Sequence, residues 1–179
     1  MIGGGGGRNL DPDLDPMSYP ETPEILLFEA DYRTQMSTEE LLIFDNFTRT
    51  KQLQYLTNAK YALDMAETLY PSSVHNGYGD AFRHALFSAL NAKILGVNTA
   101  KQLSDAHEMI PNNQILENQM DLSNNQFGRD LFVSMNSQGQ AGHFFKEGLI
   151  IALRERIING DLKQLSPLDM YGAVIPGVT

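Results

Sequence analysis

The sequence predicts an all-α protein, a single-domain bundle of five to six helices around one buried central helix. Apolar residues recur at helical spacing over most of the chain between residues 24 and 160. Segments with strand-like alternation are hard to find, and no long internal repeat is visible. The stretch from residue 80 to residue 95 is apolar on nearly every side, which is typical of a helix enclosed by other helices.

The composition excludes several classes of function. The chain has 179 residues, enough for one domain with a sizeable core. Its net charge of −9 argues against nucleic acid as a partner, because a phosphate backbone attracts basic proteins. There is no cysteine, so disulfides and thiolate metal ligands are both excluded. No apolar run approaches the roughly 20 residues of a transmembrane helix.

The ends of the chain differ from its middle. Residues 1–23 are rich in glycine, aspartate and proline and are expected to form a flexible tether. Residues 24–160 form the helical domain, and residues 161–179 are expected to be an extended tail over its surface. Met1 leads into five glycines without a signal-peptide pattern. This start fits a mature protein that is secreted, periplasmic or on the cell surface, with a lipid anchor preceding the sequence.

The first half of the domain carries clear helix signals. Residues 24–32 are an apolar segment that fits a short helix or a strand. Ser37 and Glu40 have the spacing of a capping box, which predicts a helix start. Helical periodicity then continues to about residue 70, with one break near residues 46–51.

The predicted central helix carries polar residues on one side. It covers residues 80–95 and is expected to end at Gly96. On a helical projection Asp80, His84 and Asn91 fall within roughly 40° of one another. Such a polar stripe on a core helix needs partners from elsewhere in the chain.

Two of the three later helices offer such partners. In the helix predicted for residues 99–109, capped by Asn98, His107 points toward the core and Glu108 lies nearer the rim. The next helix, residues 120–135, presents polar residues at i, i+4 and i+8, namely Asp121, Asn125 and Arg129. The last helix, residues 143–158, ends before an Asn-Gly pair.

If the three polar stripes converge, they form a metal-dependent hydrolase site. Nitrogen and oxygen ligands on facing helices are typical of zinc, manganese or iron sites, and an open coordination position gives a hydrolytic water. Glu108 is the expected general base. The expected metal ligands are Asp80, His84, His107 and Asp121. The expected catalytic residues are His84, His107, Glu108 and Arg129, and the expected substrate-binding residues are Asn125, Arg129 and Asn91.

Other interpretations of the same residues stay open. A histidine oriented by an aspartate can act as a general base without a metal. A buried network of Asp, His, Asn and Arg side chains can also tie helices together with no chemistry, as in a non-enzymatic envelope binding module. An antibacterial toxin domain is a third class. The substrate is expected to be a small or envelope-derived molecule with a phosphoester, lipid or peptide-type bond.

Three ordered motifs resemble a family of small helical bacterial domains of unknown function, found in secreted, lipoprotein-like and toxin-like proteins. They are Asn-Gly-x-x-Asp-Ala-Phe-Arg-His-Ala-x-x-Ser-Ala from residue 76, Asp-Ala-His-Glu from residue 105, and Met-Asp-Leu-x-Asn-Asn-x-x-Gly-Arg from residue 120. Phe87 stands where the family has tryptophan or tyrosine. The resemblance supplies no activity, but it implies the signature positions Asp80, Arg83, His84, Asp105, His107, Glu108, Asp121, Asn124, Asn125, Gly128 and Arg129.

Overall fold

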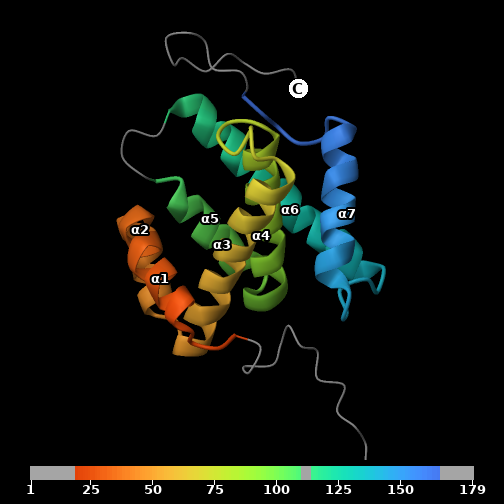
Figure 1. Cartoon of the computed structure of the whole chain (residues 1–179). Helices are drawn as coiled ribbons and strands as arrows, with labels where there is room; N and C mark the ends of the chain where they lie inside the picture. The colour runs from red at the N-terminus through yellow and green to blue at the C-terminus, as the bar shows by residue number, and fades with distance from the viewer. Residues whose placement is uncertain (1–18, 110–113, 166–179) are drawn as a thin grey trace, which may run out of the picture.

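The computed structural model describes residues 19–109 and 114–165, and within them the protein is all-helical, as predicted (Figure 1). These ranges contain seven helices, against the five to six predicted, and no strand. The number is higher because the segment near residue 24 is a helix and because the break near residue 46 divides the next helical stretch into two helices. The helices are α1 (Pro23–Gln35), α2 (Thr38–Asp45), α3 (Arg49–Leu69), α4 (Tyr78–Leu95), α5 (Val97–His107), α6 (Ile115–Ser137) and α7 (Phe145–Ile158).

Helix α4 lies at the centre of the bundle, as the apolar stretch predicted. It contacts α3, α5, α6 and α7, and Figure 1 shows it running through the middle of the molecule. Most of its side chains are buried, including Ala81, Ala85 and Ala89, whose small size lets neighbouring helices come close. Polar side chains on this helix therefore lie inside the bundle.

Helices α4 and α6 touch through their backbones at Gly128. A Cβ atom at this position would lie only 2.0 Å from the carbonyl oxygen of Ala85, so a glycine is required there. This contact fixes the position of α6 along the axis of α4. It brings Asn125 and Asp121, one and two turns before Gly128, to the polar side of α4.

The loop before α4 fixes the first turn of the helix. Asn76 has a left-handed backbone with φ of 57°, and its N–H donates to Oδ2 of Asp80 at 2.7 Å. Gly96, with φ of 88°, ends the helix where predicted. Helix α5 starts immediately afterwards, so the prediction that Asn98 caps it is wrong: Asn98 lies in its first turn.

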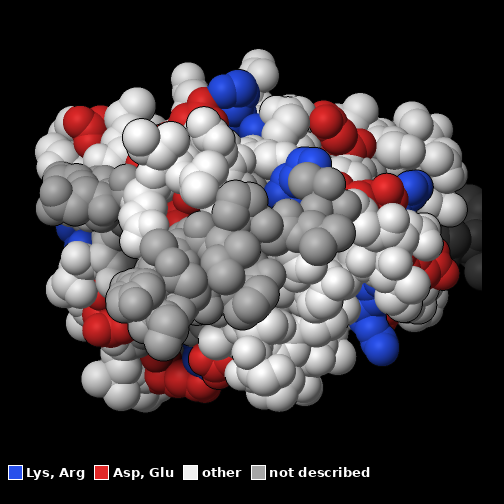
Figure 2. Space-filling view, turned by 90° about the horizontal axis from the view of Figure 1, so that it is seen from above, with Lys and Arg blue, Asp and Glu red and all other residues white. Residues whose placement is uncertain are grey.

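The end of the described chain is fastened to α6. Leu162 is buried in the core, and the backbone of Lys163 exchanges two hydrogen bonds with the side chain of Asn124. The rest of the expected tail, from residue 166, and residues 1–18 of the expected tether lie outside the described residues. No described helix combines the length and the apolar character needed to cross a membrane. On the face seen in Figure 2, acidic and basic side chains are interspersed.

Candidate functional site

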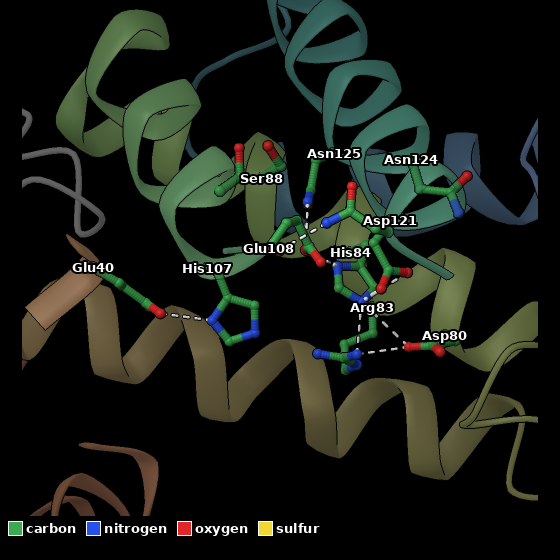
Figure 3. A network of polar contacts seen from close by, with 12 residues as sticks. Glu40, Asp80, Arg83, His84, Ser88, His107, Glu108, Asp121, Asn124 and Asn125 are labelled. Atoms are coloured by element: carbon green, nitrogen blue, oxygen red, sulfur yellow. Dashed lines mark hydrogen bonds and ion pairs between the residues drawn. The ribbon is translucent and has the colours of Figure 1, made fainter. Parts of the chain in front are cut away.

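Helices α4 and α6 bring together three of the predicted metal ligands. Nε2 of His84 lies 3.4 Å from Oδ1 of Asp80 and 3.2 Å from Oδ1 of Asp121. One donor atom from each residue lies within 4.8 Å of the other two. The side chains of Asp80 and His84 are each 5% exposed and that of Asp121 is 13% exposed. We call these three residues the Asp-His-Asp cluster (Figure 3).

Arg83 determines which nitrogen of His84 carries the proton. Its Nη2 lies 2.6 Å from Oδ1 of Asp80 and 2.7 Å from Nε2 of His84. Because a guanidinium can only donate, Nε2 must accept, and the ring proton is assigned to Nδ1. Burial, together with the charge of Arg83, lowers the pKa of His84 to about 4. His84 is therefore neutral at pH 7, with the Nε2 lone pair facing both aspartates.

The two aspartates differ in their electrostatic state. Burial would raise the pKa of Asp80, but the neighbouring His84 ring and the charge of Arg83 hold it well below its ordinary value. For Asp121, burial and the charges of Glu108 and Asp80 raise the pKa to about 9. Among the described residues, the buried Oδ1 of Asp121 has no hydrogen-bond partner. This oxygen faces the Nε2 lone pair, so the space between them needs a proton or a cation.

Glu108 lies behind His84 and is buried, so the expectation that it lies near the rim is wrong. Its Oε1 is 3.9 Å from Nδ1 of His84, on the opposite side of the ring from the aspartates. Asn125 donates to the same oxygen at 3.4 Å. Burial raises the pKa of Glu108. The predicted stripe of α6 thus reaches the site through Asp121 and Asn125.

His107 does not join the Asp-His-Asp cluster, although the sequence predicted it as a ligand. Its Nδ1 lies 2.6 Å from Oε2 of Glu40, and Tyr55 donates its hydroxyl to Oε1 of Glu40 at 2.6 Å. Burial lowers the pKa of His107, but the hydrogen bond and the charge of Glu40 outweigh burial and raise it. Figure 3 shows the second ring nitrogen of His107 turned toward Arg83.

Sequence reasoning gave no role to Glu40 or Arg83 in the site. The sequence indicates only a capping-box role for Glu40, and its backbone N–H does donate to Oγ of Ser37 at 3.0 Å. Its side chain, however, pairs with a histidine 67 positions away, which no local pattern reveals. Arg83 stood next to His84 in the first motif, and this adjacency was the one available signal.

Two predicted substrate-binding residues lie apart from the cluster. Arg129 is buried and donates to Ser104 at 2.7 Å and to Ser88 at 3.2 Å, joining α6 to α5 and α4. Asn91 accepts from Asn58 of α3 at 2.9 Å. Both side chains connect helices. Arg129 also lines a cavity of about 480 Å³ that Glu108 borders.

Comparison with known proteins supports the predicted kind of family. Searches of curated proteins and of solved structures gave no significant match. A family model described as a domain of unknown function (DUF6973) matches residues 42–158, which include α3 to α7 and the whole Asp-His-Asp cluster. Glu40 lies just before the matched range. The chain therefore belongs to this family, the domain of unknown function DUF6973.

Proposed function

We propose that this protein is a metal-dependent hydrolase whose ion is bound by Asp80, His84 and Asp121. The observation that carries the proposal is the buried, unpartnered Oδ1 of Asp121 facing the lone pair of His84 at 3.2 Å. Two acceptors at this separation repel each other unless a proton or a cation lies between them. A divalent cation bound by all three residues would satisfy both acceptors.

The spacing of the cluster fits a small transition-metal ion. Two ligand atoms that are each about 2.1 Å from a tetrahedral ion lie roughly 3.4 Å apart. The distances from His84 to Asp80 and Asp121, 3.4 and 3.2 Å, match this separation. One imidazole and two carboxylates favour zinc, manganese or iron. With three protein ligands, such an ion keeps an open position and lowers the pKa of a water bound there.

The surrounding residues have separate roles in this proposal. Glu108, on the Nδ1 side of His84, orients the ring and keeps Nε2 available, as carboxylates behind ligand histidines do. The sequence predicted Glu108 as the general base, but Glu108 lies on the side of the ring away from the ligand nitrogen Nε2. We therefore propose His107 as the general base. Its pairing with Glu40 resembles the arrangement in which a carboxylate orients a catalytic imidazole.

Arg83 would hold the anionic group of the substrate. Its Nη2 contacts two of the three ligand atoms, so an ion would take the place of this nitrogen. The Arg83 side chain is 31% exposed and long enough to move its charge outward. A guanidinium next to the ion is suited to a phosphoryl or acyl oxygen that gains negative charge.

The same contact favours a second candidate, a binding module without catalysis. Arg83 already places a positive charge within 2.7 Å of Asp80 and His84. In this alternative the network holds α4 and α6 together, and the protein binds a ligand without a metal.

An envelope or extracellular location is part of the proposal. It is supported by the glycine-rich, Asp- and Pro-containing composition of residues 1–23, which is typical of a flexible tether. Fractionation of cells from the source organism tests this location, and recovery with the cytoplasmic fraction would contradict it.

Elemental analysis of purified protein distinguishes the two candidates. After incubation with zinc, manganese or iron, the wild type should retain about one ion per chain, and Asp121→Asn and His84→Gln should lose it. His143→Gln, at an exposed histidine outside the cluster, is the matched control and should retain the ion. Circular dichroism verifies that each variant is folded. A folded wild type that takes up no ion would refute the metal site and leave the binding module.

A further inference from the structure

A cavity of about 340 Å³ adjoins the candidate site on the side of Arg83. It lies among α1, α3, α4 and α5, and His107 borders it together with Arg83. Its volume is in the lower range of small-molecule sites. The other lining residues are Phe28, Asp31, Tyr32, Gln35, Ala59, Ala62, Leu63, Val74 and Phe87. The cavity therefore combines two basic side chains with a largely apolar wall.

Both basic side chains have hydrogen-bond donors to spare. Arg83 uses Nη2 for Asp80 and His84, and within the described chain its Nε and Nη1 donate no hydrogen bond. His107 uses Nδ1 for Glu40, and its Nε2 has no partner among the described residues. Figure 3 shows this nitrogen turned toward the guanidinium. An oxyanion placed between the two side chains would accept from Arg83 and from the protonated, imidazolium form of His107.

Aromatic rings form the wall next to these donors. Tyr32 lies parallel to the ring of His107, with centroids 6.4 Å apart and planes 9° apart. Phe28 continues the stack on Tyr32 at 5.2 Å. Phe87 borders the cavity from α4. Half-buried aromatic faces of this kind bind flat apolar groups.

One acidic residue, Asp31, lies at the outer edge of the cavity. Asp31 borders the cavity but is exposed, and its Oδ2 accepts from Gln35 at 2.9 Å. A negative group on the ligand would be repelled from this outer edge. At the inner end the carboxylates Asp80 and Glu40 are already paired with Arg83 and His107.

We propose that this cavity binds a small organic anion in which a phosphate or carboxylate group is joined to an aromatic ring. The anionic group accepts from Arg83 and His107, and the ring lies against Tyr32 and its neighbours. The statement that this anion is the substrate rests on the proposed function, because the anionic group would then lie beside the ion. Binding itself needs only the cavity and its two donors.

Isothermal titration calorimetry on the full chain in the presence of EDTA tests the binding without the metal. The probes are phenyl phosphate, phenylacetate and inorganic phosphate. We expect at least one aromatic anion to bind at least tenfold more tightly than inorganic phosphate. The tighter of the two aromatic probes identifies the acidic group. Absence of saturable binding for both, or equal binding of inorganic phosphate, would overturn the proposal.

Variants locate the binding in this cavity. Leu63→Trp fills the cavity from α3 without touching the polar network and should weaken binding at least tenfold. Thr68→Trp, at an exposed position on the same helix, is the matched control and should bind normally. Arg83→Lys keeps a positive charge beside Asp80 but loses the planar guanidinium with its several N–H donors, so it should also weaken binding. Tyr32→Ala replaces Leu63→Trp if that variant does not fold. Wild-type affinity in the folded cavity variants would place the ligand elsewhere.

These measurements separate the two proposals. Anion binding in a protein that takes up no metal would retain the binding site and refute only the hydrolase. A stoichiometric ion with no anion binding would refute the cavity proposal and retain the metal site.

Discussion

At the scale of single residues, the carboxyl group of Asp121 should give the metal-free protein an unusual pH dependence. Its pKa is about 9 in the folded state, against about 3.9 in an unfolded chain. Because the folded pKa is the higher one, the contribution of this group to stability is complete below pH 4 and is lost as the pH rises toward 9. Asp121→Asn cannot ionise and should therefore gain about 1–3 kcal/mol over the wild type at pH 8.

Urea unfolding in EDTA at pH 5 and pH 8 measures this effect. The difference between Asp121→Asn and the wild type should be larger at pH 8 than at pH 5. Asp130→Asn, an exposed position on the same helix, is the control for the loss of a charge. Equal differences at the two pH values would show that Asp121 is ionised in the folded protein.

Helical spacing was sufficient to predict part of the site at this scale. Asp80 and His84 are four residues apart, so the sequence placed them on one side of a helix, and the polar stripe of α6 supplied Asp121. Spacing could not show that His107 would pair with Glu40, because that contact joins α5 to α2 across the bundle. Helical periodicity gives the direction of a side chain about its own helix and no information on the neighbouring helix.

At the scale of elements, the contact between α4 and α6 holds the two halves of the Asp-His-Asp cluster together. Gly128→Ala would place a Cβ atom 2.0 Å from the carbonyl oxygen of Ala85, and neither backbone can move without separating the helices. We expect this variant to lose about 3 kcal/mol or more of unfolding free energy, measured by chemical denaturation. Any ion bound between Asp80 and Asp121 should be lost with it.

A second glycine provides the control for this prediction. Gly148 lies inside α7, and a Cβ there would meet only Cε of Met135 at 3.5 Å. Gly148→Ala should therefore gain about 0.5–1 kcal/mol, the usual effect of alanine in a helix interior. Similar destabilisation by both substitutions would mean that helix packing at Gly128 is not the cause.

Helix centres were easier to predict than helix ends. The predicted helix at residues 120–135 is longer in the structure, Ile115–Ser137, because the two apolar residues of its first turn, Ile115 and Leu116, are exposed and show no helical periodicity. The predicted start at Asn98 was wrong because Gly96 both ends α4 and precedes α5 directly. The buried central helix was correct because a helix that is apolar all round has no solvent-facing arrangement.

At the scale of the whole molecule, the bundle is completed by segments on both sides of the family match. The matched residues, 42–158, include the Asp-His-Asp cluster. Before them, Glu40 supplies the carboxylate that orients His107, and α1 supplies Tyr32 and Phe28 to the cavity. After them, residues 161–165 lie against α6 and the loop before α4. The Asp-His-Asp cluster thus lies within the matched residues, while part of the cavity is formed by α1.

The fastening of the C-terminal segment gives the last prediction. Asn124 is fully buried; its Nδ2 donates to the carbonyl of Lys163 at 2.8 Å, and its Oδ1 accepts from the N–H of Lys163 at 2.9 Å. Asn124→Ala removes both bonds and leaves the Lys163 backbone unpaired, so stability should fall by about 1–3 kcal/mol. Hydrogen exchange should show faster exchange of the Lys163 amide, whereas Ser123→Ala, at an exposed neighbour, should leave it unchanged.

Release of this segment should also loosen the first turn of α4. Leu165 donates to the carbonyl of Asn76, and the N–H of Asn76 in turn donates to the Asp80 side chain. Unchanged protection of the Lys163 amide in Asn124→Ala would show that Leu162, buried in the core, holds the segment without the asparagine.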